Sequence, residues 1–180
     1  NTASSDGEAS SQDRGVIAKL FALMFLHHFS LGSWIVPLGT FIKANSEGGG
    51  LDLFRAGFVG VAYSALPLGF LASPLISGLL ADGRFATERM MTVLHLVSCA
   101  ALAAVTTADS QAAFLAWLIV FFVCFSPTLS LANSLCFRHL RFPERHYPLV
   151  RAGGTVGWIA AGLLVGCWHW WGDAAIESTV

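Results

Sequence analysis

The sequence predicts an all-α membrane protein with five transmembrane helices, and three observations support this. Hydrophobic residues make up 55% of the chain and charged residues 12%, with a mean hydropathy of +0.66. A soluble domain of this length does not need so much apolar surface for its core. Five apolar segments are each long enough to cross about 30 Å of hydrocarbon at 1.5 Å per residue. Short stretches of charged or turn-forming residues separate them.

The predicted spans follow one another along most of the chain. They are residues 16–42, 56–81, 90–106, 112–137 and 149–171. Turn formers stand between them, among them the glycine run 48–50 and the helix breakers Pro143 and Pro148. Residues 1–15 are rich in Ser, Asp and Gly and have little to bury, so they predict a disordered tail. Residues 173–180 are expected to be a truncated periplasmic end, cut off before a sixth helix.

The basic residues predict the orientation of the chain. With the N-terminal tail in the cytoplasm, eight of the ten Lys and Arg residues lie inside, and Lys43 and Arg55 lie outside. This asymmetry follows the positive-inside rule and predicts a cytoplasmic N-terminus. The net charge of −1, without a basic patch interleaved with aromatic residues, argues against a nucleic-acid partner.

Catalytic, metal and cofactor sites are not predicted. The four cysteines form no CxxC spacing, and His95 and His169 do not make the repeated pair at one depth that a haem requires. The chain also lacks a GxSxG elbow and paired carboxylates within its spans.

The stretch Arg151 to Trp158 combines polar and aromatic side chains at the start of the fifth span. At 100° per residue, Arg151, Thr155 and Trp158 share one helical face. Gly153 and Gly157 lie on the other side, where a small-xxx-small pair permits close approach of a second helix. Two interpretations of Arg151 remain open: an interfacial anchor, or a residue of a polar cavity.

Two further polar groups lie within spans. His27 shares a stripe with Leu31, Trp34 and Leu38, and is either a neutral imidazole bonded to another helix or a group that contacts substrate or relays protons. Asn133 shares a face with Ser126 and Ser130, which forms either a polar seam between helices or part of a substrate cavity.

Several motifs resemble known transporters. The end of the second span, with Gly78, Asp82 and Arg84, resembles the loop between the second and third helices of the major facilitator superfamily. Three other stretches resemble the nucleoside:H+ symporter family of that superfamily over about residues 16–165. These are Gly32-Ser33-Trp34 with Leu38-Gly39, Pro127-Thr128-Leu129 with Asn133, and Arg151-x-x-Gly154-Thr155-x-Gly157-Trp158.

The resemblance implies a twelve-helix carrier of two six-helix bundles that works by alternating access. Residues 16–172 would belong to its N-terminal half, and the C-terminal half of the same polypeptide would complete the site. The implied partners are a nucleoside, protons and the lipid bilayer, and the implied location is the bacterial inner membrane. Proton-coupling residues are expected in the second half.

Residue roles follow from the same resemblance. Arg151, Thr155 and Trp158 would line the substrate site, with His27 and Asn133 as further contacts. Gly78, Asp82 and Arg84 would form a cytoplasmic gating motif. Gly153 departs from the family pattern, because relatives tend to carry a large aromatic residue there. The alternatives are a carrier of another small polar solute, such as a sugar, and a membrane interaction module that does not transport.

Overall fold

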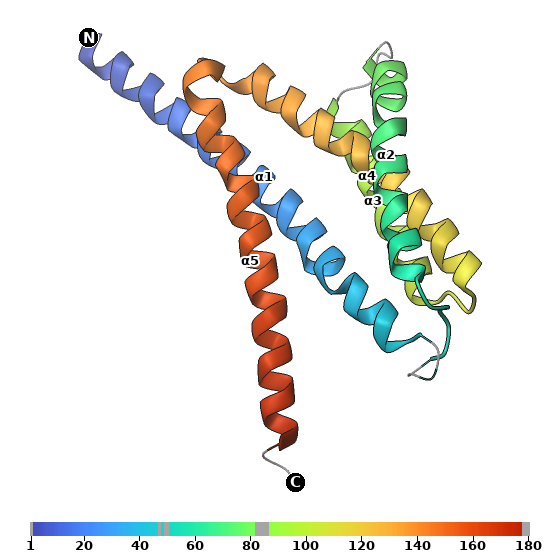
Figure 1. The fold of residues 1–180 in the computed structure, drawn as a ribbon. Coiled ribbons are helices and arrows are strands. Elements are labelled where there is room, and N and C mark those ends of the chain that lie inside the picture. The colour runs from blue at the N-terminus through green and yellow to red at the C-terminus, as the bar shows by residue number, and fades with distance from the viewer. Residues whose placement is uncertain (1, 47, 49–50, 82–86, 178–180) are drawn as a thin grey trace. The chain divides into compact units, whose positions relative to one another are not determined.

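Five α-helices make up the regular structure of the residues that the structure describes (Figure 1). The computed structural model describes the backbone of residues 2–46, 48, 51–81 and 87–177, and the side chains of residues 13–46, 48, 51–76, 78 and 87–168. The helices are α1 (Thr2–Ala44), α2 (Phe58–Ala81), α3 (Thr87–Thr106), α4 (Gln111–His139) and α5 (Pro143–Glu177). All five are long and apolar enough to cross a membrane. The five predicted spans are therefore present as helices.

The first helix begins earlier than predicted. Residues 2–15 are helical as the start of α1, where the composition predicts a disordered tail. Extending a helix costs much less than starting one, so an apolar span can carry its helix outward into good helix formers such as Gln12 and Arg14. The apolar part of this helix is Asp13–Ala44.

The fifth helix also begins earlier, at Pro143 and not at residue 149. Pro143 occupies the first helical position, where its missing N–H group has no partner to lose. Pro148 lies within the helix and removes one backbone hydrogen bond near its start. The connection between α4 and α5 is therefore shorter than the two prolines predict.

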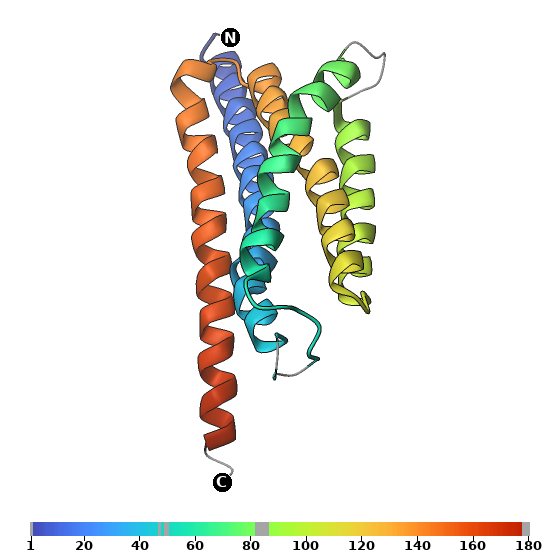
Figure 2. The ribbon, with the colours of Figure 1, turned by 45° about the vertical axis from the view of Figure 1, so that its right-hand side comes forward.

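The chain divides into two compact units, and the division falls inside α1 and α4. Unit 1 contains Asn1–Leu38 and Cys136–Val180, and unit 2 contains Gly39–Leu135. Unit 1 holds most of α1 and all of α5, and unit 2 holds α2, α3 and most of α4 (Figure 2).

Phenylalanine rings form the core at one end of unit 2. Phe54 is 1% exposed, and its ring centroid lies 5.1 Å from that of Phe58 and 4.8 Å from that of Phe114. Phe54 belongs to the connection between α1 and α2, so this core fixes the connection against both α2 and α4. The backbone N–H of Arg55 also donates to Oε1 of Gln111, at 2.9 Å.

Helix α4 packs against both α2 and α3 in unit 2, and a glycine permits the close contact with α2. A Cβ atom on Gly69 of α2 would lie 2.6 Å from the carbonyl carbon of Phe122 on α4. On α3, His95 lies beside Phe125 of α4, with 5.7 Å between the ring centroids. Both α2 and α3 thus pack against α4.

Candidate functional site

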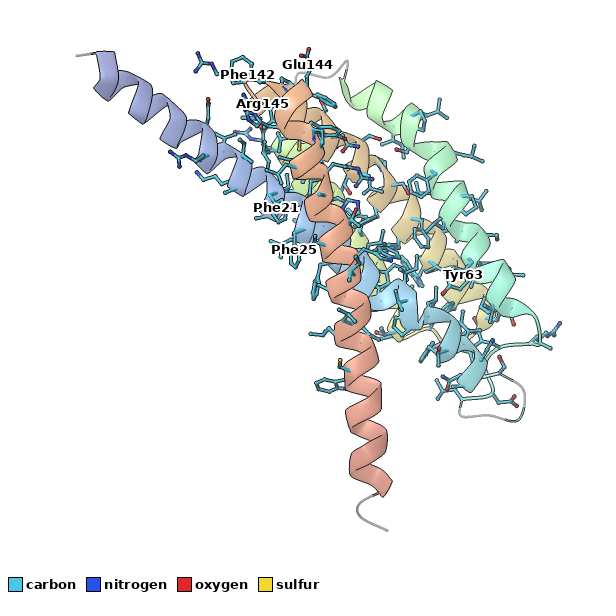
Figure 3. The ribbon with its side chains drawn as sticks, turned by 60° about the vertical axis from the view of Figure 1, so that its left-hand side comes forward. Phe21, Phe25, Tyr63, Phe142, Glu144 and Arg145 are labelled. Carbon is cyan, nitrogen blue, oxygen red and sulfur yellow. The ribbon has the colours of Figure 1, made fainter. Side chains whose placement is uncertain are left out.

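Helices α1 and α5 pack in parallel in unit 1, and glycines of α5 set their distance. A Cβ atom on Gly153 would lie 2.7 Å from the carbonyl oxygen of Phe21, and one on Gly157 would collide with the carbonyl oxygen of Phe25. Figure 3 shows Phe21 and Phe25 on α1 where α5 passes. The packing face predicted for Gly153 and Gly157 is confirmed, and α1 is the helix that approaches it.

Phe21 fills the space beside Gly153. Its ring atoms Cδ2 and Cγ lie 3.0 and 3.1 Å from the position of a Cβ atom there. An aromatic side chain from α1 therefore supplies the volume beside Gly153. A larger residue at 153 has no room beside Phe21.

The contact continues along both helices to Gly32. A Cβ atom on Gly32 would lie 3.0 Å from Cβ of Ala161 and 3.4 Å from Cε3 of Trp158. One edge of the Trp158 indole therefore rests on α1, while 39% of the residue remains exposed. This contact restrains the indole, because the absence of a side chain at Gly32 leaves a flat backbone surface against the ring.

Arg151 of α5 pairs with His28 of α1. Nη1 of Arg151 lies 3.0 Å from Nε2 of His28, and Nδ1 of His28 lies 3.0 Å from the carbonyl oxygen of Met24. A guanidinium only donates and a carbonyl only accepts, so Nε2 accepts and Nδ1–H donates. The two contacts together define a neutral imidazole with its proton on Nδ1.

Gly154 makes the space in which this pair lies. A Cβ atom at this position would lie 2.8 Å from Nδ1 of His28 and 3.1 Å from Nη1 of Arg151. The first separation is shorter than real Cβ contacts and the second is tight, so even a methyl group would displace the imidazole and press on the guanidinium. Gly154 is therefore required by the pair and is not only a packing residue.

The face predicted for Arg151, Thr155 and Trp158 carries three complementary groups. Arg151 and Thr155 are exposed, and Trp158 is partly exposed. His28 occupies one donor direction of the guanidinium, and the rest of its fork of five N–H groups stays available. Together the face offers hydrogen-bond donors to oxygen acceptors, a hydroxyl group, and a flat ring.

His27, the histidine that the sequence analysis selected, lies on a different face of α1. It is 5% exposed and belongs to the buried stripe of that helix. Its ring centroid is 5.8 Å from that of His28. The stripe runs through Leu20, Met24, His27, Leu31, Ile35, Leu38 and Ile42.

His28 was not among the site residues predicted from the sequence. The signal for it was its spacing from Phe21 and Phe25, seven and three residues earlier on the same helical face. That spacing becomes informative only when the packing of Phe21 and Phe25 on the glycines of α5 is known.

The remaining predicted site residues lie outside unit 1. Asn133 is partly buried on α4, in unit 2. Gly78 lies in α2, where a Cβ atom would meet nothing within 4 Å. Asp82 and Arg84 lie outside the described residues. Among the residues that the structure describes, no three His, Cys, Asp or Glu side chains gather where they could hold a metal ion.

Comparison with known proteins identifies the family. Residues 15–179 match the family described as Nucleoside H+ symporter. The putative nucleoside transporter YegT of Escherichia coli (strain K12) is 32% identical, over 83% of this chain and 33% of that protein. The xanthosine permease of the same organism is 30% identical, over 86% of this chain and 36% of that protein.

A solved structure shows the same fold. The chain resembles a crystal structure of the nucleoside transporter NupG with a TM-score of 0.74 and 22% identity, covering 86% of this chain and 38% of that one. The chain thus spans about a third of the length of the relatives that it matches. The predicted fold class, a transporter-type bundle of transmembrane helices, is confirmed. Because the family match extends over residues 15–179, the chain belongs to the nucleoside H+ symporter family.

Proposed function

We propose that the chain is the N-terminal part of a proton-coupled nucleoside transporter that works by alternating access. The observation that carries the proposal is the face of Arg151, Thr155 and Trp158, which α1 holds in place through His28 and Gly32. Family membership and the similarity to a xanthosine permease and a putative nucleoside transporter support the substrate class.

The chemistry of this face suits a nucleoside. Ribose hydroxyls and base carbonyls can accept hydrogen bonds from the guanidinium of Arg151. The hydroxyl of Thr155 can donate a hydrogen bond to the nucleoside or accept one from it, and a flat base can stack on Trp158. We propose His27 and Asn133 as further contacts on the strength of the resemblance. The second half of the transporter would supply the rest of the site, because such carriers bind substrate between two bundles.

The gating motif is proposed separately. Gly78, Asp82 and Arg84 stand at the end of α2 and in the connection that follows. We propose that charge contacts of Asp82 and Arg84 differ between inward-open and outward-open states. In the whole transporter, Asp82→Asn should then slow turnover more than it lowers equilibrium affinity. A large loss of affinity with normal turnover would contradict this role.

The proposal extends to location and orientation. Five membrane-crossing helices support a multi-pass membrane protein, and we place it in the bacterial inner membrane with the N-terminus in the cytoplasm. Its partners are the nucleoside, protons, the lipid bilayer and the C-terminal half of the polypeptide. We propose no catalytic role.

A competition uptake assay tests the function. The whole transporter that contains this chain is reconstituted in liposomes with an inward proton gradient, and labelled uridine uptake is challenged with other nucleosides and with free sugars. Uptake that collapses without the gradient and is displaced by nucleosides supports the proposal. Displacement by sugars alone would favour a carrier of another solute.

The 180-residue chain by itself provides the second arm of the assay. Alternating access needs one bundle to move against another, so the chain alone should not drive uptake. Uptake by the chain alone would contradict the two-bundle mechanism. Absence of both uptake and nucleoside binding in the whole protein would favour an interaction module.

A further inference from the structure

We propose that His28 is a proton-binding residue whose protonation releases Arg151 to the substrate. This inference rests on the proposed function and adds to it a proton site in this part of the transporter. The pair joins α1 to α5 across 123 residues of sequence, so a change in its state acts on two helices at once.

The geometry admits only one protonation state of His28. Nδ1–H is committed to the Met24 carbonyl oxygen at 3.0 Å, and Nε2 accepts from Arg151 at 3.0 Å. A proton on Nε2 would convert this acceptor into a donor that faces another donor. It would also place a positive imidazolium beside a positive guanidinium. Protonation and the Arg151 contact therefore exclude each other.

The Arg151 side chain can change position when its contact with His28 breaks. Its side chain is exposed, whereas His28 is half-buried and held at its other nitrogen by Met24. Gly154 leaves space beside both groups, because a Cβ atom at that position would meet the imidazole and the guanidinium. The guanidinium is thus the partner that moves, and it moves along the exposed face that carries Thr155.

A ligand oxygen would make protonation favourable. An acceptor placed between Nη1–H of Arg151 and the new Nε2–H of His28 receives two charge-assisted hydrogen bonds and separates the two positive groups. Proton and nucleoside then each strengthen the binding of the other, and the coupling is equal in both directions. Such reciprocal coupling favours loading of the proton and the nucleoside together, as in symport.

The surroundings of His28 identify the groups that influence its charge. Arg151 is the charged residue that faces it from α5, and His27 is its titratable neighbour on α1, at 5.8 Å between ring centroids. Neither is acidic, so protonation of His28 depends on the departure of Arg151, and an acceptor that arrives with the ligand favours it further.

The release of Arg151 is tested by NMR, without a nucleoside. The full chain is labelled with ¹⁵N at histidine and arginine, and Arg151→Lys identifies the Arg151 signals. At high pH we expect His28 to show a protonated Nδ1 and an unprotonated Nε2. Between about pH 8 and pH 5, the range in which histidines change charge, the Arg151 signals should shift together with those of His28. An unchanged Arg151 signal, or a His28 that stays neutral throughout, would overturn the proposal.

Coupling to the substrate is tested in the whole transporter by the pH dependence of uridine affinity. With one coupled proton, affinity should rise by up to about tenfold per pH unit as the pH falls. His28→Gln keeps an acceptor but takes up no proton, so it should lose this component and bind as the parent does at high pH. His95→Gln, a matched change in a half-buried histidine on α3, should keep the parent profile.

The two tests separate the two claims. A parent-like pH profile in His28→Gln would overturn the coupling. Absence of uridine binding in the parent at every pH would contradict the proposed function. The NMR titration would still decide whether protonation of His28 breaks its hydrogen bond with Arg151.

Discussion

Gly157 of α5 lies directly against the carbonyl oxygen of Phe25 on α1. Four residues earlier, Gly153 meets the carbonyl oxygen of Phe21 in the same way, at 2.7 Å from the position of a Cβ atom. These two backbone contacts fix both the distance and the rotation of α1 relative to α5. They therefore determine that His28, and not His27, faces Arg151.

Replacement of Gly157 should weaken this packing. In Gly157→Ala the new methyl group must push the two helices apart, which costs about 1 to 3 kcal/mol. The loss of stability is measured by thermal unfolding of the chain in detergent, with size-exclusion chromatography as the readout of folded protein. Gly162→Ala on the same helix is the control, because a Cβ atom there meets nothing within 4 Å. Equal melting temperatures for the two variants would contradict the packing role.

Replacement of Arg151 by lysine should lower nucleoside affinity although the charge is kept. A guanidinium can donate from its planar fork to two oxygens of a ligand at once, whereas an ammonium is a compact, strongly hydrated point charge. We expect a loss of about 1 to 3 kcal/mol in binding. Equilibrium binding of labelled uridine to the whole transporter measures it. Arg145→Lys, an exposed change near the start of α5, is the control (Figure 3). Parent-like binding by Arg151→Lys would leave Arg151 as an interfacial anchor.

Removal of the Trp158 ring should weaken binding through lost stacking. Aromatic stacking of a base is worth about 1 to 3 kcal/mol, so Trp158→Ala should raise the uridine Kd by roughly 5-fold to 150-fold. Trp168→Ala on the same helix is the control, since this residue is 80% exposed. Comparable losses in both variants would indicate general damage to α5 and not a base-stacking surface.

The sequence predicted the helices because their signal is local. Apolar length alone identified all five, and the spacing of Gly153 and Gly157 predicted a packing face. Local signals were less reliable at helix starts. Pro143 begins α5 although proline usually breaks a helix, because the same residue is also well suited to the first helical position.

The pairing of His28 with Arg151 could not be predicted by considering α1 and α5 separately. His27 and His28 differ by 100° around α1, and either can face α5 depending on the rotation of the two helices. That rotation depends on which side chains of α1 meet the glycines of α5. The spacing of Phe21, Phe25 and His28 places them on one face of α1, but it does not show which face of α5 packs against them.

Phe54, in the aromatic core of unit 2, should contribute strongly to stability. Phe54 is 1% exposed between Phe58 and Phe114, so Phe54→Ala should leave a cavity and cost about 3 to 5 kcal/mol. Phe70→Ala on α2 removes a ring that is 46% exposed and should cost much less. Thermal unfolding in detergent compares the two. A smaller loss for Phe54→Ala than for Phe70→Ala would show that this cluster does not stabilise the unit.

Gly154→Ala should separate the pairing of His28 with Arg151 from the packing of the helices. A methyl group there would lie 2.8 Å from Nδ1 of His28 and 3.1 Å from Nη1 of Arg151, so the pair cannot keep its geometry. The nearest groups are side-chain tips and not backbone, so they can move aside, and the unfolding temperature should fall less than in Gly157→Ala. ¹⁵N spectra of His28 should lose the signature of an acceptor at Nε2, and uridine affinity should lose its dependence on pH. Gly162→Ala should change neither readout. A Gly154→Ala chain that keeps the parent His28 spectrum and the parent pH profile would show that the pair tolerates a side chain at this position and does not depend on the space that Gly154 leaves.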